Sequence, residues 1–247
     1  MVSTQTPGSD HQATPPAGTP DRPGRSRPHH DPRGPAHRTS AHRTSAHRTS
    51  SRHTWRVVDI VVAAVVAVAS GVVFWAWNLA YAGLGGVFLA FPPSSGLVAG
   101  MWLFPAVLGA LLIRRPGAAL FTELVAAAVS ALLGSQFGLT VLASGLVQGI
   151  GAELVFLLFL YRRFTLPVAL LAGAAAGVAC GLNEAFLFAW FPEYTLAWKW
   201  LYVGFTGISG IVIAGLLSWL ATRALAATGA LAALPSRGAH REPAGRG

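Results

Sequence analysis

Long apolar blocks separated by short polar or Gly/Pro-containing segments fill residues 57–221 of the chain. A helix of roughly 20 mostly apolar residues is long enough to cross the hydrocarbon core of a membrane. The blocks therefore predict an all-α, polytopic membrane protein with six transmembrane helices, the third being the shortest. The expected spans are Val57–Ala80, Gly96–Ile113, Ala118–Leu133, Leu139–Leu160, Val168–Phe191 and Trp200–Ala221.

Nearly all the basic residues that flank these spans lie on one side. Arg56 precedes the first span, and the pairs Arg114–Arg115 and Arg162–Arg163 follow the second and the fourth. Arg223 follows the sixth span, whereas the opposite loops hold a single basic residue, Lys199. Positive residues next to spans stay on the cytoplasmic side. We therefore expect a multi-pass protein of the cell (cytoplasmic) membrane with both termini in the cytoplasm.

Composition divides the chain into three parts. Residues 1–54 are rich in Arg, His and Pro, repeat the sequence AHRTS three times, and predict a disordered cytoplasmic tail. Residues 55–228 form the predicted membrane domain, and residues 229–247 predict a flexible cytoplasmic tail. Of the net charge of +9, +6 lies in the first 56 residues. Such a tail beside a membrane is expected to contact the lipid bilayer rather than nucleic acid.

Three carboxylates, Glu123, Glu153 and Glu184, lie within the apolar blocks, with no Lys, Arg or His at comparable depth. An unpaired buried carboxylate costs several kcal/mol, so an ionisable residue inside a span suggests a functional site. A cationic ligand is one candidate partner. The alternative is that these glutamates only join neighbouring helices.

Small residues at four-residue spacing help to separate these alternatives. Glu153 continues the stripe of Gly145 and Gly149, which favours a protonated side chain that bonds to a neighbouring helix. Glu184 lies in the outer half of the fifth span beside Asn183. We expect these two residues to contact a ligand.

Aromatic residues at the outer ends of two spans could complete a pocket. Trp75 and Asn78 are one turn apart at the end of the first span, and Trp198 and Tyr202 share a face at the start of the sixth. Aromatic rings and carboxylates together suit an organic cation, although an interfacial aromatic belt is the alternative for each Trp. The apolar, Pro-containing segment 83–95 is expected to be either a lid over this pocket or a simple connector.

The chain lacks the residues of an intramembrane enzyme. Gly207–Gly210 spells the GxSG pattern of rhomboid proteases, but no histidine lies within a predicted span to act as base. His and Cys clusters for a metal are also missing from the spans, and so is a P-loop for ATP. We therefore expect no enzyme activity, no cofactor and no metal site, and any ATP hydrolysis would fall to a partner.

Two segments carry a family resemblance. Arg114–Leu120 followed by Glu123, and Val147–Glu153, are similar to the YkoE-type S components of energy-coupling factor (ECF) transporters, which capture thiamine or its hydroxymethylpyrimidine precursor for ABC-type import. The resemblance covers about residues 55–229. It implies six helices, an outward-facing vitamin site, and association with a transmembrane coupling protein and two ATPase subunits.

The resemblance and the residue patterns together give a set of candidate residues. Ala63 and Ala67 of the first span are implied to dock on the coupling protein. The candidate substrate-binding residues are Glu184, Asn183, Trp75, Asn78, Trp198, Tyr202, Gln148 and Glu123.

The chain departs from the family pattern at Ser130, where a further acidic residue is expected. A thiazolium cation would then depend on Glu184 or Glu123, and the neutral pyrimidine alone is an alternative ligand. Two other classes remain open at this point: a structural or regulatory membrane subunit without a vitamin ligand, and a stand-alone secondary carrier.

Overall fold

The computed structural model describes residues 54–245 of the chain, so the predicted tail at residues 1–53 lies outside the described part. Every regular element between residues 54 and 245 is a helix. The elements are α1 Val57–Gly83, α2 Gly85–Phe88, η1 Pro92–Trp102, α3 Phe104–Ile113, α4 Ala118–Leu132, α5 Thr140–Leu158, α6 Leu166–Leu182, η2 Asn183–Leu187, α7 Leu196–Ser209, η3 Gly210–Leu217, α8 Ser218–Ala227 and η4 Pro235–Arg241.

Five helical segments of residues 54–245 are long and apolar enough to cross a membrane, which confirms the all-helical membrane architecture. They cover Val57–Gly83, Pro92–Ile113, Thr140–Leu158, Leu166–Leu187 and Leu196–Ala227. The remaining predicted span is α4, an apolar helix of 15 residues.

The second predicted span begins earlier and is less regular than its hydrophobic pattern indicates. A 3₁₀ helix, η1, starts at Pro92 and gives way at Leu103 to the α-helix α3, whose N-terminus contains Pro105. Proline has no N–H to donate, so it is best tolerated at a helix start. Hydrophobicity alone does not reveal such a change, because apolar residues occur in both types of helix.

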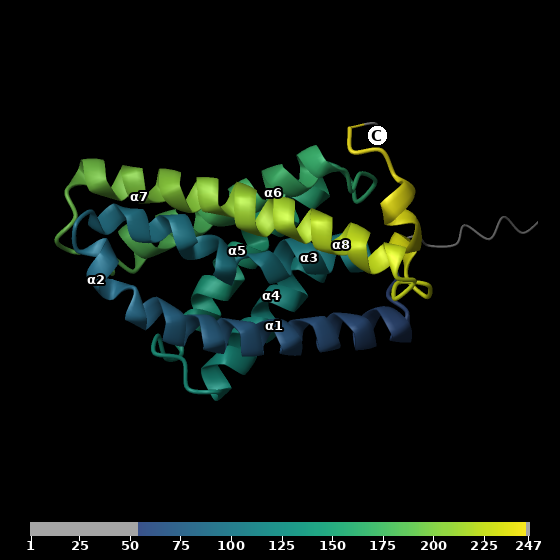
Figure 1. The fold of residues 1–247 in the computed structure, drawn as a ribbon, viewed down its shortest axis with the longest axis horizontal. Helices are drawn as coiled ribbons and strands as arrows, with labels where there is room; N and C mark the ends of the chain where they lie inside the picture. Colours follow the sequence, from purple (N-terminus) through teal and green to yellow (C-terminus); the bar gives the residue numbers. More distant parts are fainter. Residues whose placement is uncertain (1–53, 246–247) are drawn as a thin grey trace, which may run out of the picture. The chain divides into compact units, whose positions relative to one another are not determined.

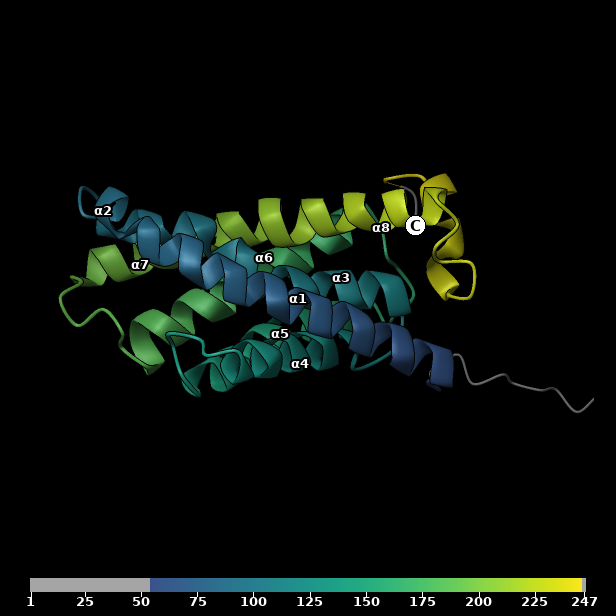
Figure 2. The same ribbon diagram turned by 60° about the horizontal axis from the view of Figure 1, so that its bottom comes forward.

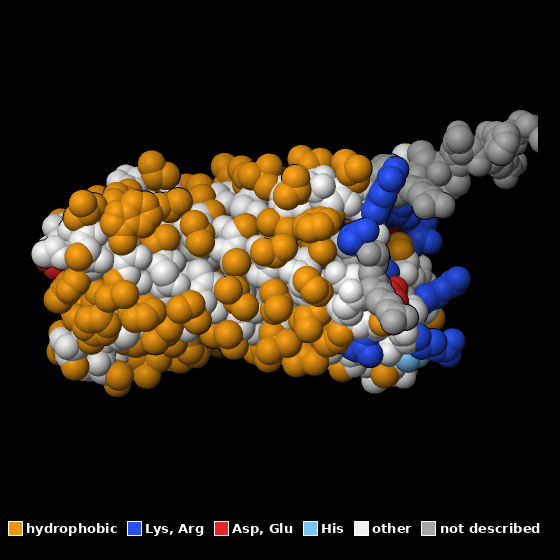
Figure 3. Space-filling model, turned by 90° about the horizontal axis from the view of Figure 1, so that it is seen from above, with side chains coloured by type: hydrophobic (Ala, Val, Ile, Leu, Met, Phe, Trp, Pro, Cys, Tyr) orange, Lys and Arg blue, Asp and Glu red, His pale blue; other side chains and the backbone are white. Residues whose placement is uncertain are grey.

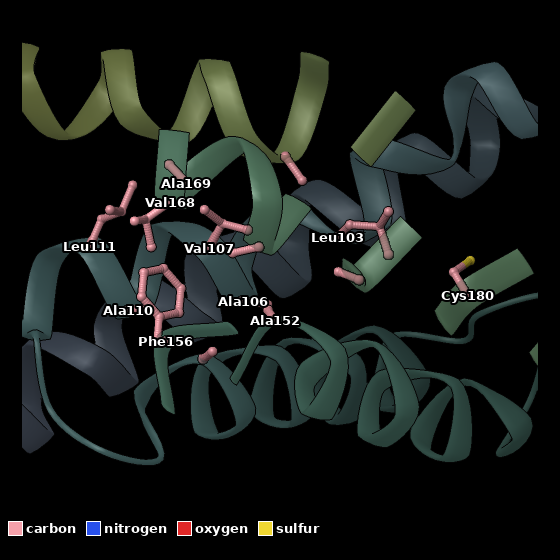
Figure 4. Close-up of a cluster of buried hydrophobic side chains, with 14 of the residues drawn as sticks. Leu103, Ala106, Val107, Ala110, Leu111, Ala152, Phe156, Val168, Ala169 and Cys180 are labelled. Carbon is pink, nitrogen blue, oxygen red and sulfur yellow. The ribbon is translucent and has the colours of Figure 1, made fainter. Parts of the chain in front are cut away.

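The helices run side by side, and α3 lies among them (Figures 1 and 2). It packs against α1 and α4 on one side and against α8 and η3 on the other. Its side chains Val107 and Leu111, with Leu103 just before it, belong with Phe156 of α5 to the largest hydrophobic cluster of the described residues, where alanines fill much of the remaining space (Figure 4). The centre of the bundle is therefore a packed core and not a channel.

Glycines bring the backbones of α6 and of the α7–η3 segment into direct contact. A Cβ atom at Gly177 would lie 2.2 Å from the carbonyl oxygen of Thr206, and one at Gly173 would lie 2.2 Å from that of Gly210. Small residues allow this approach between membrane helices, where packing rather than the hydrophobic effect holds helices together.

The exterior matches a membrane environment. Hydrophobic side chains cover the length of the face in Figure 3, while Lys and Arg side chains gather at one end. The exposed arginines at the end where α5 and α8 finish include Arg162, Arg163 and Arg237. This separation is the one expected of a bundle embedded in lipid.

The chain beyond α8 packs against the bundle over residues 229–245, part of the stretch 229–247 for which the sequence predicts a flexible tail. The hydroxyl of Ser236 in η4 donates to the carbonyl of Leu112 at 2.7 Å, and Arg223 donates to the carbonyls of Ala239 and Glu242. The Glu242 carboxylate also pairs with Arg114. Buried apolar side chains in this segment secure it against α1 and α3, which its modest hydrophobicity does not signal.

We predict that Gly177→Ala lowers the melting temperature in detergent, because the added methyl group would meet the Thr206 carbonyl. Overpacking of this kind costs about 1–3 kcal/mol. The matched control is Gly204→Ala in α7, where a Cβ would meet nothing within 4 Å. The control should be neutral or slightly stabilising, since Ala favours helix more than Gly. Equal melting temperatures for the two variants would contradict the proposed packing.

Candidate functional site

A cavity of about 440 Å³ opens among α1, η1, α4, α5, η2 and α7. It lies toward the ends of the helices opposite the exposed arginines. Its lining combines aromatic rings, hydroxyls, one amide and two carboxylates, with no Lys, Arg or His. The lining residues are Phe74, Tyr81, Ser95, Ala99, Trp102, Glu123, Ala127, Phe137, Thr140, Val141, Ser144, Gly145, Gln148, Glu184, Trp190, Phe191 and Tyr202.

Glu123 of α4 is completely buried, at 0% exposure. Its Oε2 accepts a hydrogen bond of 2.9 Å from the backbone N–H of Ala106, in the first turn of α3. Its Oε1 has no hydrogen-bond partner in the described part of the chain. One oxygen of this side chain is thus committed to the fold and the other is available.

Glu184 enters the cavity from η2, a π-helical segment that continues α6. The hydroxyl of Tyr202 donates to its Oε2 at 2.5 Å, and the thiol of Cys180 donates to its Oε1 at 3.3 Å. Both oxygens therefore have a donor before any ligand binds. A π turn is wider than an α turn and therefore changes the direction in which Glu184 points. Single π turns within α-helices are frequent at functional sites.

Gln148 and Ser144 of α5 also line the cavity, as expected for the former. Asn183 does not line it, but its side-chain amide donates to Ser144 Oγ at 3.2 Å from behind. This asparagine therefore supports the wall of the cavity.

Asn78 has a similar supporting position. Its Oδ1 accepts a 2.8 Å bond from the indole N–H of Trp102, which lines the cavity, and its amide donates to the hydroxyls of Ser130 and Ser135. Ser130, the departure from the family pattern, is thus one of the residues that hold this asparagine. At the mouth of the cavity the rings of Phe137 and Trp190 stack 5.7 Å apart with an interplanar angle of 6°.

The structure places the two predicted tryptophans outside the cavity lining. Trp75 is 37% exposed on the outside of α1, whereas Phe74 faces the cavity in its place. Four-residue spacing advances about 40° beyond a full turn at each step, so Trp75 is rotated about 120° away from Ala63. Trp198 packs against Tyr194 and Phe91, and of the segment 83–95 only Ser95 lines the cavity.

Ala63 and Ala67 lie inside the bundle at 0% exposure, which corrects the expectation that they present a docking surface. They belong to the buried face of α1, which packs mainly on α4. A small-residue stripe has the same sequence whether it faces a partner or another helix of its own chain. Segment 83–95 contains the largely exposed helix α2 and ends at Ser95, which lines the cavity.

Glu153 joins two helices, as expected, but as an acceptor and not as a protonated donor. Its carboxylate accepts bonds from the N–H groups of Gly117, Ala119 and Leu120 at the start of α4, at 2.5, 2.9 and 3.2 Å. The Tyr161 hydroxyl donates the fourth bond at 2.6 Å. Burial and this bond to Glu153 raise the pKa of Tyr161 well above its usual range, so the hydroxyl remains a donor.

The GxSG serine also has a structural position. Ser209 Oγ donates to the carbonyl of Leu97 at 2.6 Å and accepts from the N–H of Gly100 at 2.8 Å, which ties α7 to η1. Its hydroxyl is occupied by these two bonds.

The candidate residues named from the sequence omit six aromatic residues of the lining, Phe74, Tyr81, Trp102, Phe137, Trp190 and Phe191. Phe74 and Trp102 lie within predicted spans, where an aromatic residue has no distinguishing signal. Phe137 lies in the short loop between α4 and α5, and its position between two glycines was the only available indication.

A helical membrane bundle with an acidic, aromatic cavity toward one end of its helices suits a membrane-embedded subunit that binds a small molecule, and the comparisons agree with this class. Residues 58–179 match a family model described as an ABC-type cobalt transport system, permease component. The chain is 36% identical over 180 residues to YkoE of Bacillus subtilis (strain 168), named as an HMP/thiamine permease protein, covering 72% of this chain and 88% of the relative.

A solved structure described as an S component of an ECF transporter is also similar, with a TM-score of 0.69 and 35% identity. The similarity covers 74% of this chain and 91% of that chain. This chain therefore belongs to the family of YkoE-type S components of ECF transporters, and it is a multi-pass protein of the cell membrane. S components are transport subunits and not enzymes.

We predict that Glu153→Gln lowers the melting temperature in detergent. In the wild-type chain the N–H groups at the start of α4 donate to the Glu153 carboxylate, and the substitution places an NH₂ group against them. A buried donor left without an acceptor costs about 1–3 kcal/mol. The matched control, Glu193→Gln, removes a carboxylate from the exposed loop before α7 and should leave the melting temperature unchanged. A melt of Glu153→Gln that coincides with wild type would show that α4 does not depend on this cap.

Proposed function

We propose that this chain is the substrate-capture subunit of an ECF-type transporter that imports thiamine or its hydroxymethylpyrimidine precursor. The observation that carries the proposal is a pair of carboxylates, the buried Glu123 and the half-buried Glu184, in a cavity without a basic lining residue. A cationic or donor-rich ligand offsets the cost of burying such groups. Thiamine offers a thiazolium cation and an aminopyrimidine with N–H donors, which is the chemistry in the name of the B. subtilis relative.

The size and lining of the cavity support the same ligand. Its volume of about 440 Å³ lies in the range of small-molecule sites. Trp102, Trp190 and Tyr202 contribute aromatic rings to the lining, against which a planar heterocycle can pack. A cation over such a ring gains about 0.5–2 kcal/mol. In this proposal Glu184 supplies the charge, Gln148 and Glu123 contact the ligand, and Asn78 and Asn183 hold the walls.

The proposed orientation has six transmembrane helices, with α4 as the short one, and both described ends on the cytoplasmic side. The exposed arginines at the ends of α5 and α8 support it, because such residues remain in the cytoplasm. The cavity then opens toward the outside, where a scarce vitamin is captured.

Import in this proposal requires a transmembrane coupling protein and two ATPase subunits. The sequence has no GxxxxGK[ST] loop, so this chain does not bind ATP in the manner of a P-loop protein. The resemblance to S components supports partners of this kind. Uptake by the chain alone would instead indicate a secondary carrier.

We predict that thiamine raises the melting temperature of the purified protein, and that Glu184→Gln weakens thiamine binding about tenfold or more, measured by titration calorimetry. The substitution keeps the shape of the side chain but removes the charge that a thiazolium would pair with, and tenfold corresponds to about 1.4 kcal/mol. Trp75→Phe, on the lipid-facing side of α1, should bind thiamine as wild type does.

Two results would oppose this proposal. Folded wild-type protein that neither thiamine nor hydroxymethylpyrimidine stabilises would favour a structural or regulatory subunit, because a bound ligand must stabilise the folded state. Wild-type affinity in folded Glu184→Gln would remove this residue from the ligand site.

A further inference from the structure

We propose that Glu123, with Gln148 beside it, recognises the amino-substituted edge of the ligand's heteroaromatic ring, and that Glu123 Oε1 accepts a hydrogen bond from the exocyclic amine. The inference rests on the proposed function and deepens it, since it names the residue that decides which ring is accepted. It starts from the contrast between the two carboxylates of the cavity.

Glu123 is the carboxylate with an unused acceptor. Its side chain is 0% exposed and lines the cavity, yet Oε1 has no partner among residues 54–245. A buried acceptor left without a donor costs about 1–3 kcal/mol, and more when it is charged. A ligand N–H that reaches Oε1 removes this cost. Binding energy is therefore available at this atom for a ligand that carries a donor.

Glu184 contributes in a different way. Each of its oxygens already accepts a bond, one from Tyr202 and one from Cys180. The residue supplies negative charge to the cavity without depending on a ligand donor at one defined point. Charge of this kind attracts any cation, whereas Glu123 is suited to distinguish one ring edge from another.

The position of Glu123 is fixed by packing and by a backbone bond. Its Oε2 is held by the N–H of Ala106, and a Cβ built at Gly149 would lie 3.3 Å from its Cβ. An ionised carboxylate offers acceptors only, so Glu123 in its ionised form presents an acceptor to any ligand. Gln148 precedes Gly149 on α5 and lines the same cavity, and its amide can present either a donor or an acceptor.

This pair complements one ring edge. An aminopyrimidine places an N–H₂ donor next to a ring-nitrogen acceptor, which matches the acceptor of Glu123 and the donor of Gln148. The 4-oxo analogue of thiamine reverses the pattern and places an acceptor against Glu123. Gln148 can turn its amide to suit either ring, whereas ionised Glu123 offers only acceptors. Discrimination is therefore expected to depend on Glu123.

The test compares dissociation constants of the full-length protein for thiamine and for its 4-oxo analogue, which share the same thiazolium. Wild type should bind thiamine about 10- to 100-fold more tightly, the effect of one mispaired buried polar group. In Glu123→Gln the carbonyl oxygen can still accept from Ala106 N–H while the NH₂ group replaces Oε1. This variant should bring the ratio of the two constants close to one or reverse it.

The matched control is Glu184→Gln, which should weaken both ligands by a similar factor and leave their ratio unchanged. If thermal denaturation shows that Glu123→Gln is not folded, Glu123→Asp replaces it. Asp keeps the charge but is too short to reach both Ala106 N–H and the amine, so the ratio should again fall.

The outcomes separate this inference from the proposed function. Wild type that binds neither ligand contradicts the proposed function itself. Wild type that binds both ligands equally, or a Glu123 variant that keeps the wild-type ratio, overturns the role of Glu123 while vitamin capture stands. A preference for thiamine over the 4-oxo analogue that disappears in the Glu123 variant but persists in Glu184→Gln supports the role of Glu123.

Discussion

Backbone N–H groups at helix starts inside a membrane bundle need acceptors, because lipid offers none. Two glutamates meet this requirement in succession. Glu153 of α5 accepts the first N–H groups of α4, and Glu123 of α4 accepts the N–H of Ala106 in α3. Negative charge at a helix N-terminus also interacts favourably with the helix dipole. The central helix α3 is thus held by α4, which is held in turn by α5.

The same arrangement creates the candidate site. The carboxylate that caps α3 has one oxygen left over, and that oxygen belongs to the cavity lining. Glu123 therefore serves both the fold and the proposed ligand recognition. Its bond to α3 makes its position well defined. Glu184 reaches the cavity by another route, through the π-helical continuation of α6. A preorganised polar group on a rigid helix loses little freedom when a ligand binds.

Close backbone contact supports these polar groups. Gly173 and Gly177 bring α6 against the α7–η3 segment, and Ser209 ties that segment to η1 through two hydrogen bonds. The GxSG pattern is accounted for by this packing role. Irregular helices such as η1, η2 and η3 occur beside the cavity and the core, where side-chain direction matters more than helical regularity.

The sequence by itself determined the all-helical membrane architecture, because long apolar blocks have few other stable arrangements, and it identified Glu123, Gln148, Glu184 and Tyr202 as polar residues needing an explanation. Only the tertiary structure decided which helix faces are internal. Ala63 and Trp75 fit the same periodicity, yet one is buried against other helices and the other faces outward. The order of the C-terminal segment and the acceptor role of Glu153 were also decided there. Both depend on contacts between residues distant in the chain, which local hydrophobic patterns do not encode.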